Sequence, residues 1–342
     1  MPVLNTQRGF SLVELMVSLV LGLLVISAAG SLFLSNQRIY GATESINRIQ
    51  ENQRAAFELL ARDVREAGGN PCTRNIVNML DTSKPGGSGS YYTDWMDGVS
   101  GRNGTGPAAS DEITLSHATD SMVRVTGNDN PSAEIEVETN AGFETGDILM
   151  VCNADVSSIF QVTNTANNKL GHNAGNGNPG NLEKPFQRDQ DTFDRNTAAQ
   201  TGYCYLPPAT GANPNCLNAP SGSPAMVVRP TAVRWFLADN GRGGTSLYRQ
   251  VITNGGANVG VRGEIAEGVT DLQITYKVGP ATDYVDAAAG LAWGDVTAVN
   301  VRMVFQAVSG ALSRTQTQGT DGQALTRTLN DYIVLRNHQD IR

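Results

Sequence analysis

Glu14 is a charged residue at a position where the surrounding sequence is apolar, so core packing does not explain it. It lies inside an apolar run that extends from Phe10 to Leu34. A run of this length crosses about 30 Å of hydrocarbon as a helix. A lone carboxylate in such a segment costs on the order of several kcal/mol and is by default a functional residue. Glu14 is therefore a candidate functional residue.

Four cysteines form the second group with possible chemistry: Cys72, Cys152, Cys204 and Cys216. An even number of cysteines in an exported chain predicts disulfides. Four cysteines allow three pairings, and the sequence does not decide among them. We favour Cys204 with Cys216, which bracket a Pro-rich loop, and Cys72 with Cys152, which would tie the end of a long helix to the first strands. The C-x-x-C spacing of structural zinc sites is absent.

Catalytic patterns are missing from the sequence. The three histidines, His117, His172 and His338, are far apart, and none belongs to an H-E-x-x-H pair. The sequence also lacks a G-x-S-x-G elbow and a phosphate-binding G-x-x-x-x-G-K. A membrane-anchored hydrolase would need such a constellation. We therefore expect no catalytic residues, no metal site, no cofactor and no enzymatic activity.

The apolar run that holds Glu14 is the first element to consider. Arg8 and the terminal amine precede it and most of the chain follows, so the positive-inside rule predicts a cytoplasmic N-terminus and an exported remainder. A secretory signal peptide is the first alternative, with Ser27-Ala28-Ala29 as its cleavage site, but the run is too long for a signal core. A plain membrane anchor is the second. Neither alternative explains Glu14.

The start of the chain resembles the type IV prepilin signature, which has a short basic leader ending in Gly, then Phe, then a hydrophobic helix with Glu at its fifth position. The matching residues are Gly9-Phe10-Ser11-Leu12-Val13-Glu14. The resemblance implies cleavage between Gly9 and Phe10 by a prepilin peptidase, N-methylation of Phe10, and packing of the helix into a filament. Residues 1–9 are then the leader and 10–34 the transmembrane and filament-core helix.

The resemblance also implies a partner for Glu14. Cleavage would create an α-ammonium at Phe10, and each of the two charges is costly if left alone in an apolar filament core. In the family, this Glu is thought to neutralise the terminal amine of a neighbouring subunit during assembly. We therefore assign Glu14 to filament assembly as a prediction.

The helix is predicted to continue beyond the membrane, over residues 35–69. Apolar residues recur in steps of three, four or seven, which traces one helical face. Proline is absent from Phe10 to Asn70, and Gly68-Gly69 followed by Pro71 predicts a helix stop. The residues of the apolar face are Ile39, Ile46, Ile49, Ala56, Phe57, Leu60, Val64 and Ala67.

Residues 50–69 carry a second resemblance, to the PilW type of minor pilin and more loosely to the J-type pseudopilin of type II secretion. Without the N-terminal motif, an ordinary amphipathic helix would explain this stretch. Roughly 300 residues follow Leu34, which is more than a minimal pilin head needs. This length favours the PilW type, with the J-type pseudopilin as the alternative.

The remainder, 70–342, is predicted to be a β-rich periplasmic head. Short β-prone runs recur between turn residues, and 239–244 predicts a hairpin turn. An antiparallel sheet packed on the helix gives an α+β, pilin-like fold with long loop insertions. We read 163–226 as surface loops, which leaves two possible lobes at about 70–163 and 226–342. The predicted strands are 112–116, 122–126, 133–139, 147–152, 159–163, 232–238, 246–252, 269–278, 296–308 and 325–335.

Charge narrows the possible partners. The formal net charge is −8, and Lys and Arg are not clustered as a nucleic-acid surface requires, so we expect no nucleic acid. The resemblance implies other partners: prepilin peptidase, the inner-membrane assembly platform, the major pilin, other minor pilins and a large tip adhesin. It also implies a single-pass protein of the inner membrane that later enters a pilus filament or its tip.

Overall fold

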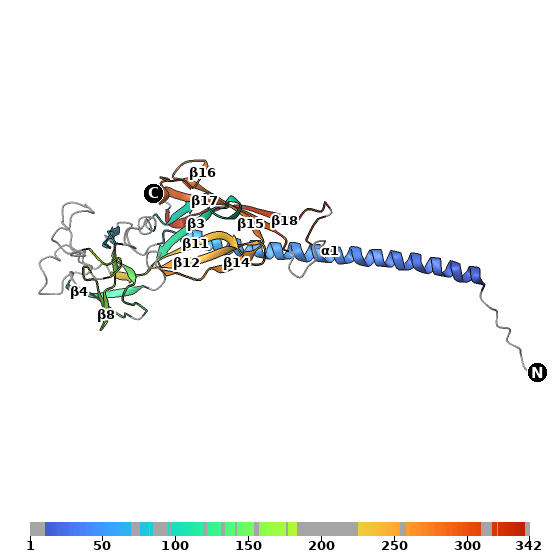
Figure 1. Cartoon of the computed structure of the whole chain (residues 1–342). Helices are drawn as coiled ribbons and strands as arrows, with labels where there is room; N and C mark the ends of the chain where they lie inside the picture. The colour runs from blue at the N-terminus through green and yellow to red at the C-terminus, as the bar shows by residue number, and fades with distance from the viewer. Residues whose placement is uncertain are drawn as a thin grey trace, which may run out of the picture. The chain divides into compact units, whose positions relative to one another are not determined.

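The computed structural model describes residues 11–69, 76–81, 83–84, 95, 97–118, 122–130, 134–140, 142–153, 157–175, 177–182, 225–253, 258–308, 317–319 and 321–338. One long helix, α1 (Leu12–Glu66), is followed by β-sheets whose strands pair antiparallel with one exception (Figure 1). The chain therefore has the α+β organisation that the sequence predicts. The exception is the parallel pair of β1 and β7.

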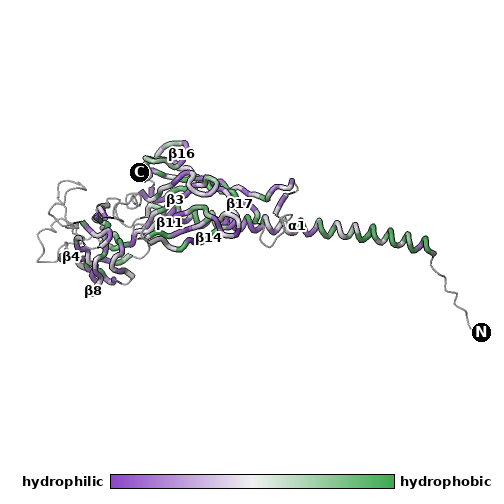
Figure 2. Tube along the Cα trace, viewed as in Figure 1, coloured by the Kyte–Doolittle hydropathy of each residue, from purple (hydrophilic) through white to green (hydrophobic). Residues whose placement is uncertain are grey.

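The helix ends where its sequence predicts. Gly68 has a φ of +70°, the left-handed conformation that glycine adopts without a steric penalty and that commonly closes helices. Hydrophobic residues dominate the N-terminal part of α1, whereas polar residues become frequent toward Glu66 (Figure 2).

Two compact units make up the structure: Met1–Glu51 with Gln306–Arg327, and Asn52–Phe305 with Thr328–Arg342. In the first unit, Gly41, Ser45 and Ile49 are buried along α1. Backbone hydrogen bonds hold the later segment of this unit: the Ala307 N–H donates to Leu325 O at 2.8 Å, and the Leu325 N–H donates to Thr317 O at 2.9 Å.

The second unit contains most of the sheet structure, and the last turns of α1 pack in it. Ala56, Leu60 and Val64 are fully buried, which confirms this part of the predicted apolar face. The strands form three sheets within the described residues. The first, of eight strands, has the order β1 (Ile76–Asn78), β7 (Ser157–Gln161), β6 (Ile148–Cys152), β10 (Met226–Val228), β4 (Val123–Asn130), β5 (Glu134–Val137), β9 (Lys169–Gly171) and β8 (Asn164–Ala166).

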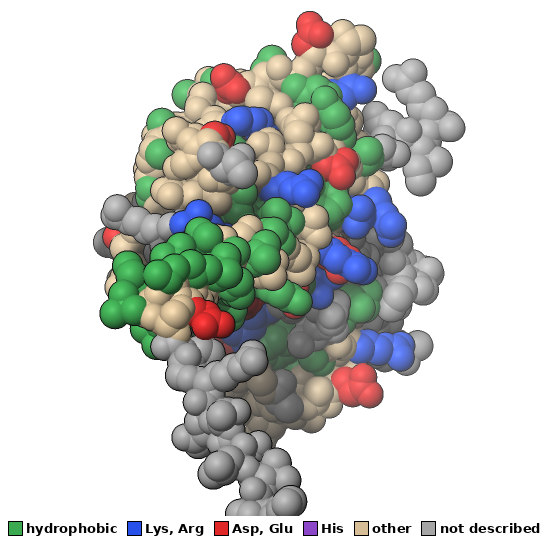
Figure 3. All heavy atoms as spheres, turned by 90° about the vertical axis from the view of Figure 1, so that its right-hand side faces the viewer, with side chains coloured by type: hydrophobic (Ala, Val, Ile, Leu, Met, Phe, Trp, Pro, Cys, Tyr) green, Lys and Arg blue, Asp and Glu red, His purple; other side chains and the backbone are tan. Residues whose placement is uncertain are grey.

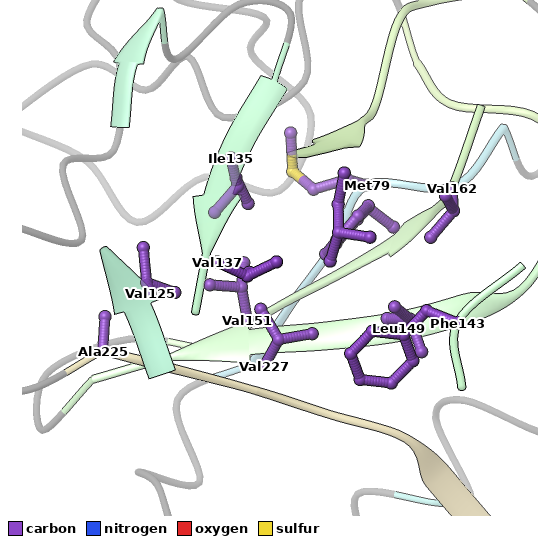
Figure 4. Packing of buried hydrophobic residues seen from close by; sticks show 12 residues of the cluster. Met79, Val125, Ile135, Val137, Phe143, Leu149, Val151, Val162, Ala225 and Val227 are labelled. Atoms are coloured by element: carbon purple, nitrogen blue, oxygen red, sulfur yellow. The ribbon is translucent and has the colours of Figure 1, made fainter. Parts of the chain in front are cut away.

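The eight-stranded sheet has apolar clusters built from alternating strand residues. Leu149 and Val151 of β6 enter one cluster, while Ile148 and Met150 enter another. Figure 4 shows side chains of the first cluster converging from several strands. Its buried members are Met79, Val125, Ile135, Val137, Phe143, Leu149, Val151, Phe160, Val162, Leu170, Ala225 and Val227.

The other two sheets contain strands that the sequence predicts well. In the second sheet, β11 (Pro230–Asp239) and β12 (Thr245–Thr253) pair from Ala232↔Ile252 to Asp239↔Thr245, which confirms the predicted hairpin. The order of this sheet is β13 (Asn258–Val259), β12, β11, β3 (Glu112–Ala118) and β2 (Val99–Arg102), with β14 (Gly263–Glu267) on β12. The third sheet has the order β16 (Tyr284–Asp286), β15 (Val269–Val278), β17 (Val296–Gln306) and β18 (Thr326–Val334).

The reading of 163–226 as loops alone is wrong at its start, where β8 and β9 form a hairpin. Asn167 and Asn168 connect these strands with φ of 51° and 58°. Two-residue hairpin turns with both φ values positive favour Asn and Gly, so this Asn-Asn pair was a usable turn signal. Residues 183–224 lie outside the described residues. The division into two lobes stays a prediction.

Candidate functional site

The N-terminal end of α1 is organised by Ser11. Its hydroxyl Oγ accepts a hydrogen bond from the Glu14 N–H at 3.2 Å, and its carbonyl accepts one from the Leu15 N–H at 3.2 Å. Ser11 is therefore an N-cap, and Glu14 stands at the third helical position, the spacing of a capping box. The S-x-x-E spacing signals this role, which we did not predict from the sequence. Gly9 and Phe10 lie outside the described residues, so the cleavage position stays a prediction.

Glu14 is exposed in the first turn of α1 and forms no ion pair with any residue that the structure describes. The Ser18 hydroxyl donates to the Glu14 backbone carbonyl at 2.7 Å. A carboxylate beside the partially positive helix N-terminus is favoured electrostatically. No cation among the described residues occupies the carboxylate of Glu14, which can therefore accept one supplied from elsewhere.

Apolar side chains surround this carboxylate. Large hydrophobic residues between Leu12 and Leu34 are more than half exposed, and Figure 3 shows hydrophobic side chains gathered at the end of the molecule that faces the reader. Exposure on this scale marks a membrane or protein contact. Within the described residues, α1 is the helix long and apolar enough to cross a membrane.

A buried ion pair fixes the other part of α1 to the second sheet. The carboxylate of Asp63 is 1% exposed. Its Oδ2 accepts from Trp235 Nε1 of β11 at 2.9 Å and from Arg249 Nε of β12 at 2.7 Å. Arg249 Nη2 lies 3.4 Å from Oδ1. An Asp between Leu60 and Val64 on an apolar face signals a buried partner, but Asp63 was not among the residues predicted from the sequence.

The end of α1 is closed by residues near the end of the chain. Asn337 Nδ2 donates to Ala67 O at 3.1 Å and to Glu66 O at 3.4 Å, so it caps carbonyls that the helix leaves without an intrahelical donor. His338 packs against Gly98 so closely that a Cβ on Gly98 would lie 2.5 Å from His338 Nε2 and 2.7 Å from the Cα of Gly68. This arrangement gives His338 a packing role.

The other histidines are also packed rather than grouped. His172 is fully buried, its ring lies edge-on to Phe160 at 5.9 Å, and burial lowers its pKa to about 3. His117 lies in β3. Among the residues described, no group of three His, Cys, Asp or Glu side chains could hold a metal ion.

Of the four cysteines, the described residues include Cys152, which is disulfide-bonded. It is fully buried at the end of β6. Cys72, Cys204 and Cys216 lie outside the described residues. The pairs Cys72–Cys152 and Cys204–Cys216 therefore stay predictions.

Comparison with known proteins bears on the N-terminus. Residues 4–30 match the family model described as the prokaryotic N-terminal methylation motif. Comparisons with curated proteins and with solved structures find no match. The matched segment includes Glu14, its N-cap Ser11 and the first turns of the exposed apolar helix, and proteins with this motif are generally structural. The chain carries a type IV pilin-like prepilin signal at residues 4–30.

Proposed function

We propose that this protein is a non-enzymatic minor pilin of the PilW type that takes part in type IV pilus assembly. It is held in the inner membrane by α1, with the N-terminus cytoplasmic and the head periplasmic. Prepilin peptidase cleaves between Gly9 and Phe10, and Phe10 is N-methylated. The mature protein then joins other minor pilins in a priming or tip complex that contacts the major pilin and a large tip adhesin.

The observation that carries this proposal is the position of Glu14. It lies within the methylation motif at residues 4–30 and in the first turn of a 55-residue helix. A charge on an apolar helix requires a counter-charge when water is removed. The methylated ammonium of a neighbouring subunit supplies that counter-charge, so the pair forms only when subunits assemble.

The processing step is tested by intact mass and N-terminal sequencing of membrane-extracted protein from cells with and without prepilin peptidase. We expect a methylated Phe10 as the first residue, only when the peptidase is present. An uncut Met1 would indicate a plain membrane anchor, and a start near Ser31 would indicate a cleaved signal peptide.

The assembly step is tested with Glu14→Ala. We expect normal membrane insertion and processing but strongly reduced recovery of the subunit in sheared filaments, because the neighbouring ammonium loses its counter-charge. Glu51→Ala is the matched control, since Glu51 is exposed on the same helix beyond the apolar segment. Equal incorporation of the two variants would contradict the role of Glu14.

A J-type pseudopilin of a type II secretion system shares the motif, the helix and Glu14, and is the alternative. The length of the head supports the pilin. Deletion followed by complementation separates the two: loss of surface pili with intact secretion of exoproteins supports the pilin, and the reverse result supports the pseudopilin.

A further inference from the structure

The residues just after the apolar segment of α1 present an unusual exposed group. Tyr40 is 80% exposed and Ile39 is 61% exposed. Arg38 beside them is also exposed. One helical face here is covered, because Gly41 and Ser45 are buried. Ile39 and Tyr40 lie outside that face. Arg38 lies on the same side as Gly41, three residues earlier, but it is still exposed, so all three side chains need another environment.

Arg38 differs from three of the other four arginines of α1; Arg65 also forms no ion pair with a described residue. Arg48 pairs with Glu44 at 2.7 Å, Arg54 with Glu58 at 2.8 Å, and Arg62 lies 4.0 Å from Glu66. Arg38 forms no ion pair with any described residue. The sequence gives the reason, because the positions three and four residues away hold no carboxylate; they are Leu34, Ser35, Gly41 and Ala42.

The spacing along α1 matches one bilayer. At about 1.5 Å per residue, Glu14 and Leu34 are separated by about 30 Å, the thickness of the hydrocarbon core. Arg38 and Tyr40 follow Leu34 by about 6 Å and about 9 Å, which places them in the headgroup layer when Leu34 marks the edge of the hydrocarbon. Glu14 then lies at the opposite edge of the hydrocarbon.

We propose that Arg38 and Tyr40 form a lipid-headgroup anchor that sets the depth of α1 in the membrane. The Arg38 guanidinium binds the phosphate oxygens of the periplasmic leaflet, and the Tyr40 ring lies at the level where amphipathic aromatic side chains concentrate. This inference rests on the membrane localisation proposed above. Its consequence is that the anchor holds Glu14 at the cytoplasmic interface, where its carboxylate contacts headgroups and water before assembly.

Depth is measured by quenching of tryptophan fluorescence in the full-length protein, reconstituted in vesicles of phosphatidylethanolamine and phosphatidylglycerol. One set of vesicles carries a quencher at the headgroup, and the other carries bromine deep in the acyl chains. The signal of each Trp variant is corrected for the native tryptophans with wild-type protein. We expect Tyr40→Trp to be quenched mainly at the headgroup and Leu24→Trp, midway between Glu14 and Leu34, mainly by the deep bromine.

Tyr332→Trp is the control for non-specific quenching, because Tyr332 is 58% exposed on β18, outside the apolar helix. We expect neither quencher to affect it. If Leu24→Trp is quenched and Tyr40→Trp is not, α1 is in the membrane but the anchor is wrong. If Leu24→Trp escapes both quenchers, the membrane localisation itself fails, and the anchor with it.

The anchoring effect is tested by adding Arg38→Gln and Tyr40→Ser to the Leu24→Trp protein. Without the anchor we expect the reporter to move toward one interface by about one helical turn, ~5 Å. Arg54→Gln in the same reporter protein is the matched control and should leave the depth unchanged. An unchanged depth in the Arg38→Gln, Tyr40→Ser protein would overturn the proposal.

Discussion

Removal of the Asp63 carboxylate should lower the free energy of unfolding, because this group joins α1 to the second sheet. Asp63→Ala leaves the Arg249 guanidinium without its partner and the buried Trp235 N–H without its acceptor. Breaking a buried ion pair from one side costs about 3–5 kcal/mol, and an unsatisfied donor costs about 1–3 kcal/mol. Because the Arg249 side chain keeps 25% exposure and regains water, we expect a total loss of about 3–4 kcal/mol.

The free energy of unfolding is measured by urea titration of the detergent-solubilised full chain, followed by tryptophan fluorescence. Glu58→Ala is the control, because its pair with Arg54 is exposed and should contribute about 0.5 kcal/mol or less. Asp63→Leu combined with Arg249→Met should recover much of the loss, since no unpaired charge remains. A loss from Asp63→Ala no larger than the control loss would refute the role of the buried pair.

Three further predictions concern packing, capping and pH. Gly98→Ala should destabilise by about 2–3 kcal/mol more than Gly241→Ala, because both have a φ of +71° but a Cβ on Gly241 meets no atom within 4 Å; paired urea titrations measure the difference. Asn337→Ala should cost about 1 kcal/mol by the same assay, because the helix end loses its donor. Burial lowers the pKa of His172 to about 3. Between about pH 6.5 and about pH 3 the imidazole is protonated in the unfolded state and neutral in the folded state, so the free energy of unfolding falls as the pH drops through this range. One proton contributes a slope of about 1.4 kcal/mol per pH unit to the free energy of unfolding. Urea titrations from about pH 6.5 to about pH 4.5 should show this contribution in the wild type and not in His172→Phe. Equal slopes in the two proteins would contradict this reasoning.

Local patterns explain which parts of the fold the sequence predicts. The end of α1 follows from Gly68 and Gly69, and β15 has the predicted bounds of 269–278 because its buried and half-buried residues largely alternate. The β8–β9 hairpin was missed because its strands are short, and the Asn167-Asn168 turn was the available signal. Asp63 shows more clearly what local sequence patterns cannot predict. Its partner Arg249 is 186 residues away in sequence, and no local pattern places the two together.

The residues of the candidate site also differ in whether the sequence alone identifies them. Glu14 could be identified from the sequence, because a charge in an apolar run is anomalous wherever the run lies. The N-cap role of Ser11 was signalled by the S-x-x-E spacing, and the start of the helix at Leu12 establishes it. The cleavage position, the assembly role of Glu14 and the two disulfide pairs stay predictions, because Gly9, Phe10 and three of the cysteines lie outside the described residues.

The closure of α1 by Asn337 and His338 has a consequence for the order of biosynthesis. The donor that caps the carbonyl of Ala67 lies 270 residues later in the sequence, so it is translated long after the helix. In the proposed orientation, a chain still passing through the export channel lacks both the cap and the residue that packs over Gly98. The C-terminal end of α1 therefore completes its packing only after Asn337 and His338 have also crossed the membrane.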